Sequence, residues 1–369
     1  MPVDWKEIRK DFPVTRKWLY LDHASAGPLP RPVYEEGVAC LKEYHCLSDL
    51  SFDRWVRRRE EVRGEVARLI GARPDEIGFT HSTSEGMNII CDHLQSAKEV
   101  VAGELEFPSS TVPWLYRDFP VRWVKAQSGI LPVQEYQKVM GRSPGVLLSS
   151  YVQFINGFRQ DLKALGSIKK NHRFVVNATQ GLGVFPLNVR TCLIDALATN
   201  SYKWFLGGYG GGFVYISREL LARGKPAYVG WRSVRTKVPY GNRDFVLRKD
   251  AGRCEYGCPN FINIFMMGRV IEYQRQIGCE NIRGRILSLC DDLIQGLQQL
   301  GLTIASPLEK KYRSGIVVFA HSDPIPLARR LLQRRVFVNP RGAGIRVAPH
   351  FYNNSQDIQK FLKILKTEL

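Results

Sequence analysis

The segment from residue 77 to residue 216 alternates short apolar runs with helix-like stretches, and this alternation constrains the fold more than any other feature of the chain. Runs this short fit buried strands, and their separation by helical patterns is typical of a parallel sheet with helices on both faces. We therefore predict an α/β fold with a mostly parallel central sheet flanked by helices. The apolar runs are 77–79, 100–101, 121–124, 145–148, 174–176, 196–198 and 213–216.

The segments on either side of this alternation predict more helices and a second, smaller unit. Residues 32–71 form a charged, amphipathic stretch that reads as two helices broken near 48–51. Helical patterns cover 261–276, 280–300 and 355–369, and short strand patterns cover 314–319, 336–338 and 344–348, with a helix after Pro326. A chain of 369 residues exceeds the usual size of one domain. We predict a large domain over 15–245 and a small α+β domain over 246–369 together with 1–14.

The apolar runs, the first residues and the cysteines of the chain indicate in which compartment the protein is expected. The chain has no run of about 18 apolar residues, and its first residues are charged, so neither a membrane-spanning helix nor a secretory signal is expected. Its eight cysteines are scattered. Cys254 and Cys258 are the closest pair, but no second pair completes a zinc-type motif. We expect free thiols in a cytoplasmic protein and no metal site.

The net charge of +18 is unusual for a chain of this length. Such a field attracts anionic partners, including nucleic acid, acidic membranes and acidic carrier proteins. No nucleic-acid-binding motif accompanies it, and the basic pairs are spread along the chain. Two interpretations stay open: a generally basic surface, or a dedicated acidic or carrier-bound partner.

Lys203 lies in a tight setting of aromatic residues and glycines. It follows Tyr202 and precedes Trp204, and glycines occupy 207, 208 and 210–212. A lone lysine beside a strand is most often a surface residue. Burial, however, favours the neutral amine, and a neutral amine forms an imine with an aldehyde cofactor. Lys203 is therefore the candidate catalytic residue of a pyridoxal phosphate site.

Several motifs follow one another in order over nearly the whole chain, from 20–30 to 345–353. Asn177-Ala178-Thr179-Gln180 closes one strand, Ser201-Tyr202-Lys203-Trp204 follows the next, and Gly210-Gly211-Gly212-Phe213 opens another. Together they resemble the class V aminotransferases, a family that includes cysteine desulfurases, kynureninase and epimerase-like members. The resemblance implies fold-type I architecture, a pyridoxal phosphate cofactor and a homodimer. One position departs, because the family aspartate that hydrogen-bonds the pyridine nitrogen is Asn177 here.

The resemblance also implies a set of cofactor-binding residues. Thr83 and Ser84 lie where a strand meets a helix, and free N–H groups at a helix start bind phosphate. An ordinary serine or threonine helix cap explains that segment equally well. Asn200 and Tyr202 are further candidate phosphate donors. Phe107 is the candidate for stacking on the cofactor ring, with a core phenylalanine as the alternative.

The same resemblance implies further contacts, to the phenolic oxygen of the cofactor and to the phosphate of the neighbouring protomer. Asn156 and Gln180 are placed to contact the phenolic oxygen of the cofactor. Cys258 stands where the family has a threonine that binds the phosphate of the neighbouring protomer. A thiol is a weaker donor, so Trp231 or Asn260 is a candidate substitute.

Arg346 and His23 are the candidate substrate-binding residues. A guanidinium offers two parallel donors to a carboxylate, which suits an amino acid substrate, and 345–353 resembles the family's carboxylate-binding segment. A surface arginine is the plainer interpretation of Arg346. His23 stands in place of the family's frequent asparagine.

The neutral side chain of Asn177 indicates which type of reaction the site favours. A neutral amide cannot stabilise a protonated pyridine as a carboxylate does, so the ring takes up electrons less well, which disfavours transamination and tolerates β-elimination or racemisation. Segment 336–344 has no cysteine, so persulfide transfer through a mobile-loop cysteine is not expected. We predict a pyridoxal phosphate enzyme that acts at Cα or Cβ of a small amino acid through a Lys203 aldimine, by C–S lyase-like β-elimination. The alternatives are a class V aminotransferase, an epimerase or, in another class, a catalytically reduced binding protein.

Overall fold

The computed structural model describes residues 3–238, 240–241 and 243–369, and its largest element is a seven-stranded sheet. The strands follow the order β2-β8-β7-β6-β5-β3-β4, and all are parallel except β8, which is antiparallel to both neighbours. Each predicted apolar run overlaps one strand, so the predicted α/β fold is confirmed. The strands are β2 (Ile77–Thr80), β3 (Val100–Gly103), β4 (Val121–Val124), β5 (Val146–Ser150), β6 (Arg173–Asn177), β7 (Ala196–Asn200) and β8 (Gly212–Ile216).

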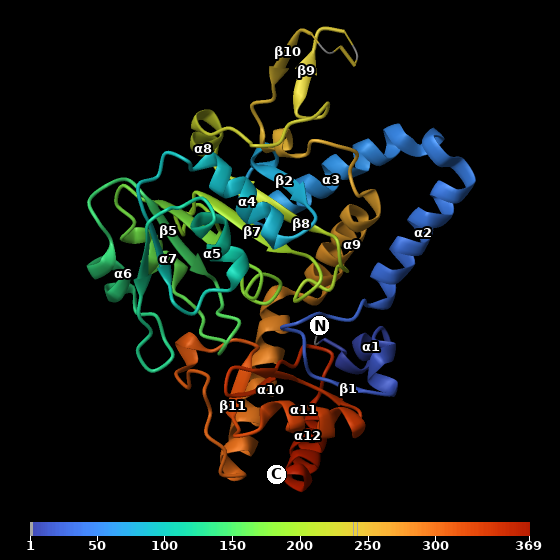
Figure 1. The fold of residues 1–369 in the computed structure, drawn as a ribbon. Coiled ribbons are helices and arrows are strands. Elements are labelled where there is room, and N and C mark those ends of the chain that lie inside the picture. Colours follow the sequence, from blue (N-terminus) through green and yellow to red (C-terminus); the bar gives the residue numbers. More distant parts are fainter. Residues whose placement is uncertain (1–2, 239, 242) are drawn as a thin grey trace.

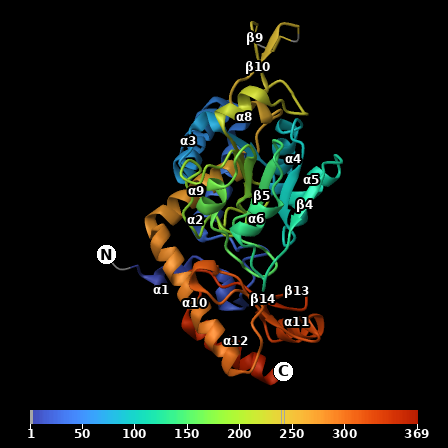
Figure 2. The same cartoon turned by 90° about the vertical axis from the view of Figure 1, so that its left-hand side faces the viewer.

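Side chains of the sheet point alternately into two cores. Val146 and Leu148 of β5 face one core, and Leu147 between them faces the other. Figure 2 shows the covering layers, with α4 (Thr83–His93) and α5 (Pro108–Leu115) on one face and α3 (Phe52–Ile70) and α9 (Phe261–Ile277) on the other. Because both faces are covered, the strands are apolar throughout rather than alternating with polar residues.

The predicted break in the N-terminal helical stretch is confirmed. α2 (Arg31–Leu47) and α3 are separated by the 3-10 turn η2 (Ser48–Ser51). α3 ends at Gly71, whose φ of 68° is the left-handed conformation that glycine adopts without strain. α9 packs on α2 and α3. Shorter helices connect the strands: η3 (Pro74–Glu76), α6 (Val133–Val139), α7 (Leu162–Ser167) and α8 (Arg218–Arg223).

The C-terminal part forms a separate three-stranded antiparallel sheet, in the order β11-β14-β13, below the large sheet in Figure 1. The N-terminal strand β1 (Leu19–Tyr20) pairs in parallel with β12 (Val336–Phe337), which joins the two ends of the chain. The elements of this part are α1 (Trp5–Lys10), η1 (Pro13–Arg16), α10 (Cys279–Gln299), η5 (Lys310–Tyr312), β11 (Val317–Ala320), α11 (Pro324–Gln333), β13 (Asn339–Arg341), β14 (Gly344–Val347) and α12 (Ser355–Glu368).

The predicted domain boundary at 245/246 lies within β10 (Phe245–Leu247). This strand pairs with β9 (Val234–Thr236) in a hairpin that projects from the body of the molecule (Figure 1). Beyond it, η4 (Ala251–Cys254) contacts β2, and α9 lies against the helices of the large sheet. The division of the chain at this point stays a prediction.

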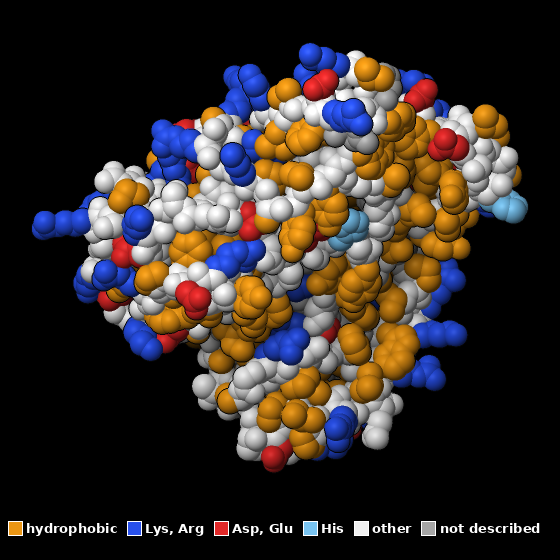
Figure 3. Space-filling model, turned by 45° about the horizontal axis from the view of Figure 1, so that its top comes forward, with side chains coloured by type: hydrophobic (Ala, Val, Ile, Leu, Met, Phe, Trp, Pro, Cys, Tyr) orange, Lys and Arg blue, Asp and Glu red, His pale blue; other side chains and the backbone are white. Residues whose placement is uncertain are grey.

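The surface carries the excess of basic residues without concentrating it on the side that Figure 3 presents. There, lysine and arginine side chains are distributed among hydrophobic and neutral ones. Within the described part of the chain, none of the helices combines the length and the apolar character needed to cross a membrane.

Candidate functional site

Lys203 lies in the connection between β7 and β8, at the edge of the sheet where the parallel strands end. The irregular segment that begins at Asp22 packs behind it. Gly27 donates its backbone N–H to the Tyr202 carbonyl at 2.8 Å, and a Cβ on this glycine would come 2.6 Å from the Lys203 carbonyl oxygen. A residue without a side chain is therefore required at 27 for this close approach.

A pocket opens at Lys203, and the ends of three parallel strands reach it: β5 at Ser150, β6 at Asn177 and β7 at Asn200. Ligands of open α/β sheets bind at such carboxyl ends. Eight of the predicted site residues line the pocket: Thr83, Ser84, Phe107, Asn177, Gln180, Asn200, Tyr202 and Lys203. Sequence positions more than a hundred residues apart are thus brought together around one amine.

The environment of Lys203 favours its neutral form. The Nζ atom lies 5.8 Å from the ring centroids of both Phe107 and Tyr202. Burial, together with the nearby charges of Arg346 and Arg341, lowers the pKa of Lys203 to about 8. The uncharged fraction of this amine near neutral pH is therefore much larger than that of an ordinary lysine, which favours a nucleophilic role.

One end of the pocket is built from hydroxyl and amide groups at the start of α4. Ser82 caps the helix by accepting from the Glu85 N–H at 3.2 Å, so the cap role belongs to Ser82. Thr83 follows it in the first turn and shares a hydrogen bond of 2.7 Å with Thr179. Ser84 faces Ser109 at 3.0 Å. Free N–H groups at a helix start and this cluster of donors suit a phosphate group.

The side-chain amide of Asn200, at the same end of the pocket, has hydrogen-bonding capacity that the protein does not use. Its Nδ2 donates to the Thr83 hydroxyl at 3.3 Å, while its buried Oδ1 finds no partner among the described residues. Rotating the amide by half a turn lets the oxygen accept from Thr83 and presents the N–H₂ group to the pocket. The residues present therefore fit the phosphate of pyridoxal phosphate.

Phe107 and Asn177 line the middle of the pocket. The Phe107 ring is 40 % exposed and packs edge-on against Phe154, which rules out a core phenylalanine. The amide of Asn177 is held at both ends, because Nδ2 donates to the Ser110 hydroxyl at 2.9 Å and Oδ1 accepts from the Thr179 N–H at 3.1 Å. The aromatic ring suits stacking on a flat cofactor.

Arg346 is a buried arginine on β14, 1 % exposed, which excludes the surface interpretation. Its guanidinium donates to Ser25 at 2.6 Å and to the Phe154 carbonyl at 3.2 Å, and it pairs with Asp22 at 3.2 Å. The buried Nε atom has no hydrogen-bond partner in the described part of the chain. Two of its five N–H groups, that of Nε and one on Nη1, are thus without a partner in the described chain, and Arg346 is not among the residues that line the pocket at Lys203.

Gln180 and His23 both have hydrogen-bond partners inside the protein at each of their polar side-chain atoms, and Gln180 keeps one further N–H. Gln180 donates to the Ala24 carbonyl at 2.8 Å and accepts from the Trp204 indole at 2.7 Å. His23 is fully buried, and its ring nitrogens contact the Ala348 carbonyl at 3.0 Å and the Tyr352 hydroxyl at 2.8 Å. Burial lowers the pKa of His23 to about 3. Contrary to the expectation of a substrate contact, this histidine has both polar atoms occupied inside the protein.

Three predicted cofactor residues lie outside the pocket of this chain. Asn156 donates to the Gly129 carbonyl at 2.6 Å and accepts from the Phe158 N–H, so its amide stabilises its own loop. Trp231 is exposed. Cys258, also exposed, lines a different cavity. Their predicted roles toward the cofactor have no support from the geometry of one protomer.

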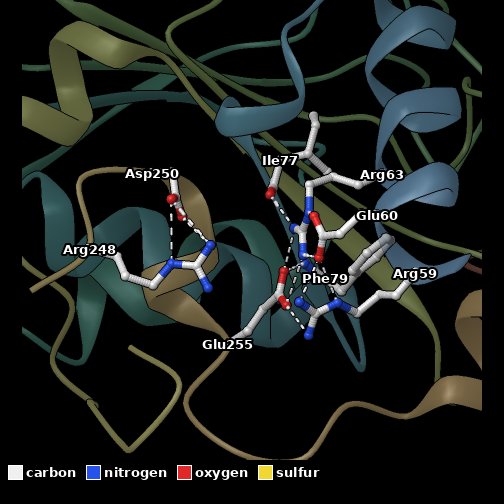
Figure 4. A network of polar contacts seen from close by, with 8 residues as sticks. All are labelled: Arg59, Glu60, Arg63, Ile77, Phe79, Arg248, Asp250 and Glu255. Carbon is white, nitrogen blue, oxygen red and sulfur yellow. Dashed lines mark hydrogen bonds and ion pairs between the residues drawn. The ribbon is translucent and has the colours of Figure 1, made fainter. Parts of the chain in front are cut away.

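The segment that carries Cys258 is anchored by a buried ion cluster, shown in Figure 4. Glu255 pairs with Arg63 at 2.5 Å and with Arg59 at 3.6 Å, and it accepts from the Phe79 N–H at 3.0 Å. Burial alone would lower the pKa of Arg63, but Glu255 and Glu60 raise it above its ordinary value. The cluster therefore holds this segment firmly against α3 and β2.

Sequence reasoning missed several polar residues of the pocket. Ser109, Ser150 and Thr179 line it, and Glu106 lies buried just behind Ser150. The sequence did offer a signal for two of them. Ser150 lies at a predicted strand end, and Thr179 lies inside a motif already identified in the sequence. Glu106 had no such signal, because its partners lie 44 and 47 positions further along the chain.

Comparison with known proteins shows which family the chain resembles. The family model described as aminotransferase class-V matches residues 19–361. An uncharacterized aminotransferase, YcbU, of Bacillus subtilis is 27% identical, with 96% of this chain and 95% of the relative covered. A protein described as "Probable cysteine desulfurase" from Methanothermobacter thermautotrophicus is also 27% identical, with the same coverage of both chains.

Solved structures share the fold. The apo cysteine desulfurase of Thermococcus onnurineus superposes with a TM-score of 0.90 at 24% identity, over 100% of this chain and 98% of that one. The cystine C–S lyase C-DES, in complex with cysteine persulfide, superposes with a TM-score of 0.88 at 19% identity, over 96% and 99% of the two chains.

Proposed function

The chain belongs to the aminotransferase class-V family of pyridoxal phosphate-dependent enzymes, and we propose that it catalyses β-elimination from an amino acid, as a C–S lyase. The observation that carries the proposal is the neutral amide of Asn177 in the pocket. A carboxylate at this position would stabilise a proton on the ring nitrogen, whereas an amide supplies no charge. The ring then takes up electrons less well, which favours reactions in which the charge at Cα is dissipated at once by a leaving group on Cβ.

The residues that hold the cofactor are those of the pocket. Thr83, Ser84, Asn200 and Tyr202, which line the pocket, would bind the phosphate, and Phe107 would pack on the ring. When bound, pyridoxal phosphate supplies an aldehyde for the amine and a conjugated ring that withdraws electrons from Cα.

Lys203 and Arg346 have different roles toward the substrate. The Nζ atom of Lys203 would hold the cofactor and, once the substrate is bound, would accept the proton from Cα, a role that its lowered pKa of about 8 supports. Arg346 would bind the substrate carboxylate through its unpartnered Nε and would fix the orientation of Cα relative to Lys203. Asp22 keeps the guanidinium in place.

The distribution of cysteines supports a lyase over a persulfide-forming desulfurase. No cysteine lines the pocket within the described chain, and segment 336–344 contains none. Sulfur released from a substrate therefore has no enzyme thiol at the site to accept it. The product leaves as free sulfide, a thiol or a persulfide.

A screen of amino acids, including cysteine and its S-conjugates, tests the proposal through pyruvate, ammonia and sulfide release. We expect release of pyruvate and ammonia from a substrate with a leaving group at Cβ. The variant Asn177→Asp should raise the ratio of half-transamination to elimination, because a carboxylate stabilises the protonated ring. An unchanged ratio, or transamination or epimerisation as the main wild-type activity, contradicts the proposal. A purified protein without pyridoxal phosphate absorbance would favour the binding-protein alternative instead.

The assembly is part of the same proposal. Exposed apolar side chains follow one another along α2, which supports a homodimer with this helix in or near the interface. They are Tyr34, Leu41, Tyr44 and Leu47. The dimer would bring Cys258 and Trp231 to the partner's pocket, where their predicted phosphate contacts belong. The net charge of +18 supports an acidic or carrier-bound partner.

A further inference from the structure

A cavity of about 350 Å³ lies apart from the pocket at Lys203 and shares no lining residue with it in the described chain. Its walls come from the C-terminal end of α3, from the irregular segment 182–187 and from the junction of α9 and α10. A cavity of this size, with a mainly apolar lining and few polar groups, is typical of small-molecule sites. The apolar lining includes Leu69, Leu182, Phe185, Leu187, Ile271 and Ile282.

Gln274 of α9 is the buried polar residue of this lining. It is 8 % exposed, and its Nε2 donates to the carbonyl of Trp204 at 3.0 Å and to that of Phe205 at 3.3 Å. A carbonyl can only accept, so these two bonds fix which end of the amide faces them and use both hydrogens of Nε2. Oε1 accepts from no donor among the described residues and keeps contact with solvent. Because Gln274 lines the cavity, Oε1 offers an acceptor to a ligand there.

The exposed side of the cavity carries a positive charge that its carboxylate does not cancel. Arg68 and Arg275 both line the cavity, and both pair with the same Glu65, at 2.5 Å and 3.0 Å. One carboxylate therefore faces two guanidinium groups, whose side chains are 67 % and 62 % exposed. Each guanidinium has five N–H donors, so donors remain for an anion. The excess positive charge favours a ligand with one carboxylate.

The cavity also touches the backbone that carries Lys203. Gly183 lines it, and a Cβ at this position would come 2.8 Å from the carbonyl carbon and oxygen of Trp204. The same carbonyl accepts from Gln274, and the Trp204 indole donates to Gln180, which lines the pocket at Lys203. The cavity and the pocket are thus separated by one stretch of backbone that both of them contact.

We propose that this cavity binds a small carboxylic acid with an apolar body and one hydrogen-bond donor, and that the bound acid stabilises the backbone beside Lys203. The donor meets Gln274 Oε1, the apolar body fills the apolar lining, and the carboxylate lies at Arg275. By linkage, the acid and pyridoxal phosphate raise each other's affinity. The inference goes beyond the proposed function, since the cavity does not depend on which reaction the pocket performs.

Calorimetric titration of the holoenzyme with 4-hydroxyphenylacetate tests the site. Phenylacetate lacks the donor for Gln274 and should bind about three- to tenfold more weakly. Leu69→Trp, at a lining residue that is 37 % exposed, fills the cavity from its outer side and should weaken binding by about tenfold or more. Arg275→Gln should weaken it by about threefold. Arg223→Gln, at an exposed arginine on α8, is the matched control and should leave binding unchanged.

Cys279 gives a second readout that needs no activity. Its thiol is exposed and lines the cavity, whereas the exposed Cys46 on α2 does not line it. With 4-hydroxyphenylacetate at ten times its Kd, iodoacetamide should alkylate Cys279 about tenfold more slowly and Cys46 at an unchanged rate, as measured by mass spectrometry. Equal rates at Cys279 with and without millimolar acid overturn the site. Binding that Leu69→Trp leaves intact also overturns it.

The link to Lys203 is tested on the diluted holoenzyme, where the visible absorbance reports bound pyridoxal phosphate. Saturating 4-hydroxyphenylacetate should lower the Kd of pyridoxal phosphate by about fivefold, and Leu69→Trp should abolish this effect. An unchanged Kd overturns the coupling. A holoenzyme that fails these tests leaves the proposed function standing, whereas a chain that binds the acid but no pyridoxal phosphate removes the proposed function and keeps the site.

Discussion

Two buried polar clusters, one around Glu255 and one around Lys203, differ in how their charges are paired. The carboxylate of Glu255 has two arginine partners, Arg63 and Arg59, and it also accepts a hydrogen bond from a backbone N–H, that of Phe79. Around Lys203, the amine has no carboxylate hydrogen-bonded to it in the described structure, and Glu106 has only neutral donors. Paired charges stabilise a segment, while a charge kept without a counter-ion has a shifted pKa and is available for chemistry.

The largest expected effect comes from removing the unpaired amine. Lys203→Ala should lower turnover by about a thousandfold or more, because one residue supplies both the cofactor attachment and the proton acceptor. The visible absorbance of the loaded enzyme should disappear, while the midpoint of thermal unfolding of the apoprotein stays the same or rises. Steady-state kinetics and a thermal melt measure the two effects.

Lys225→Ala, at an exposed lysine, is the control for that experiment. It should leave turnover and absorbance unchanged. Activity of Lys203→Ala within tenfold of the wild type would contradict the role of this residue.

The second effect belongs to the paired cluster. Glu255→Gln leaves Arg63 and Arg59 buried without their carboxylate, so the free energy of unfolding should fall by about 3–5 kcal/mol. Glu106→Gln strands no cation and should cost less, about 1–3 kcal/mol. Glu272→Gln, which breaks a partly exposed pair with Arg269, is the control and should stay within about 0.5 kcal/mol. Urea unfolding measures all three, and equal losses at 255 and 106 would remove the distinction between the clusters.

The smallest effect concerns pH. Burial, Arg346 and Arg341 lower the pKa of Lys203 to about 8, so the rate at which the apoprotein captures pyridoxal phosphate should rise with pH through that value. Removing a positive neighbour favours the ammonium form, so Arg341→Gln should raise the midpoint by up to about one pH unit. Stopped-flow absorbance measures the midpoint, with exposed Arg334→Gln as control. A midpoint that falls or stays constant in Arg341→Gln would argue against this coupling.

The same pKa has a consequence for stability. The folded value, about 8, lies below the ordinary value of 10.5, so the unfolded chain binds the proton more tightly. The apoprotein should therefore gain stability as the pH rises from about 8 to 10.5, and Lys203→Ala should lose this dependence.

Features carried by local pattern could be predicted from the sequence. The strands of the large sheet, the helix break at 48–51 and the family all follow from periodicity and from motifs a few residues long. Roles that depend on contacts between distant segments could not. His23 is the clearest case, since its place in a family motif suggested a substrate contact while the fold buries it between Ala348 and Tyr352. The individual roles of the pocket residues stay predictions.

The sequence alone determined that this chain is a pyridoxal phosphate enzyme and that an amide replaces the usual acid at 177. Only the tertiary structure decided which groups hold that amide in the pocket. Asn177 donates to Ser110, 67 positions away, and this hydrogen bond exists only once β6 and α5 have packed together. Which partners a buried amide meets is a property of that packing, which no local pattern encodes.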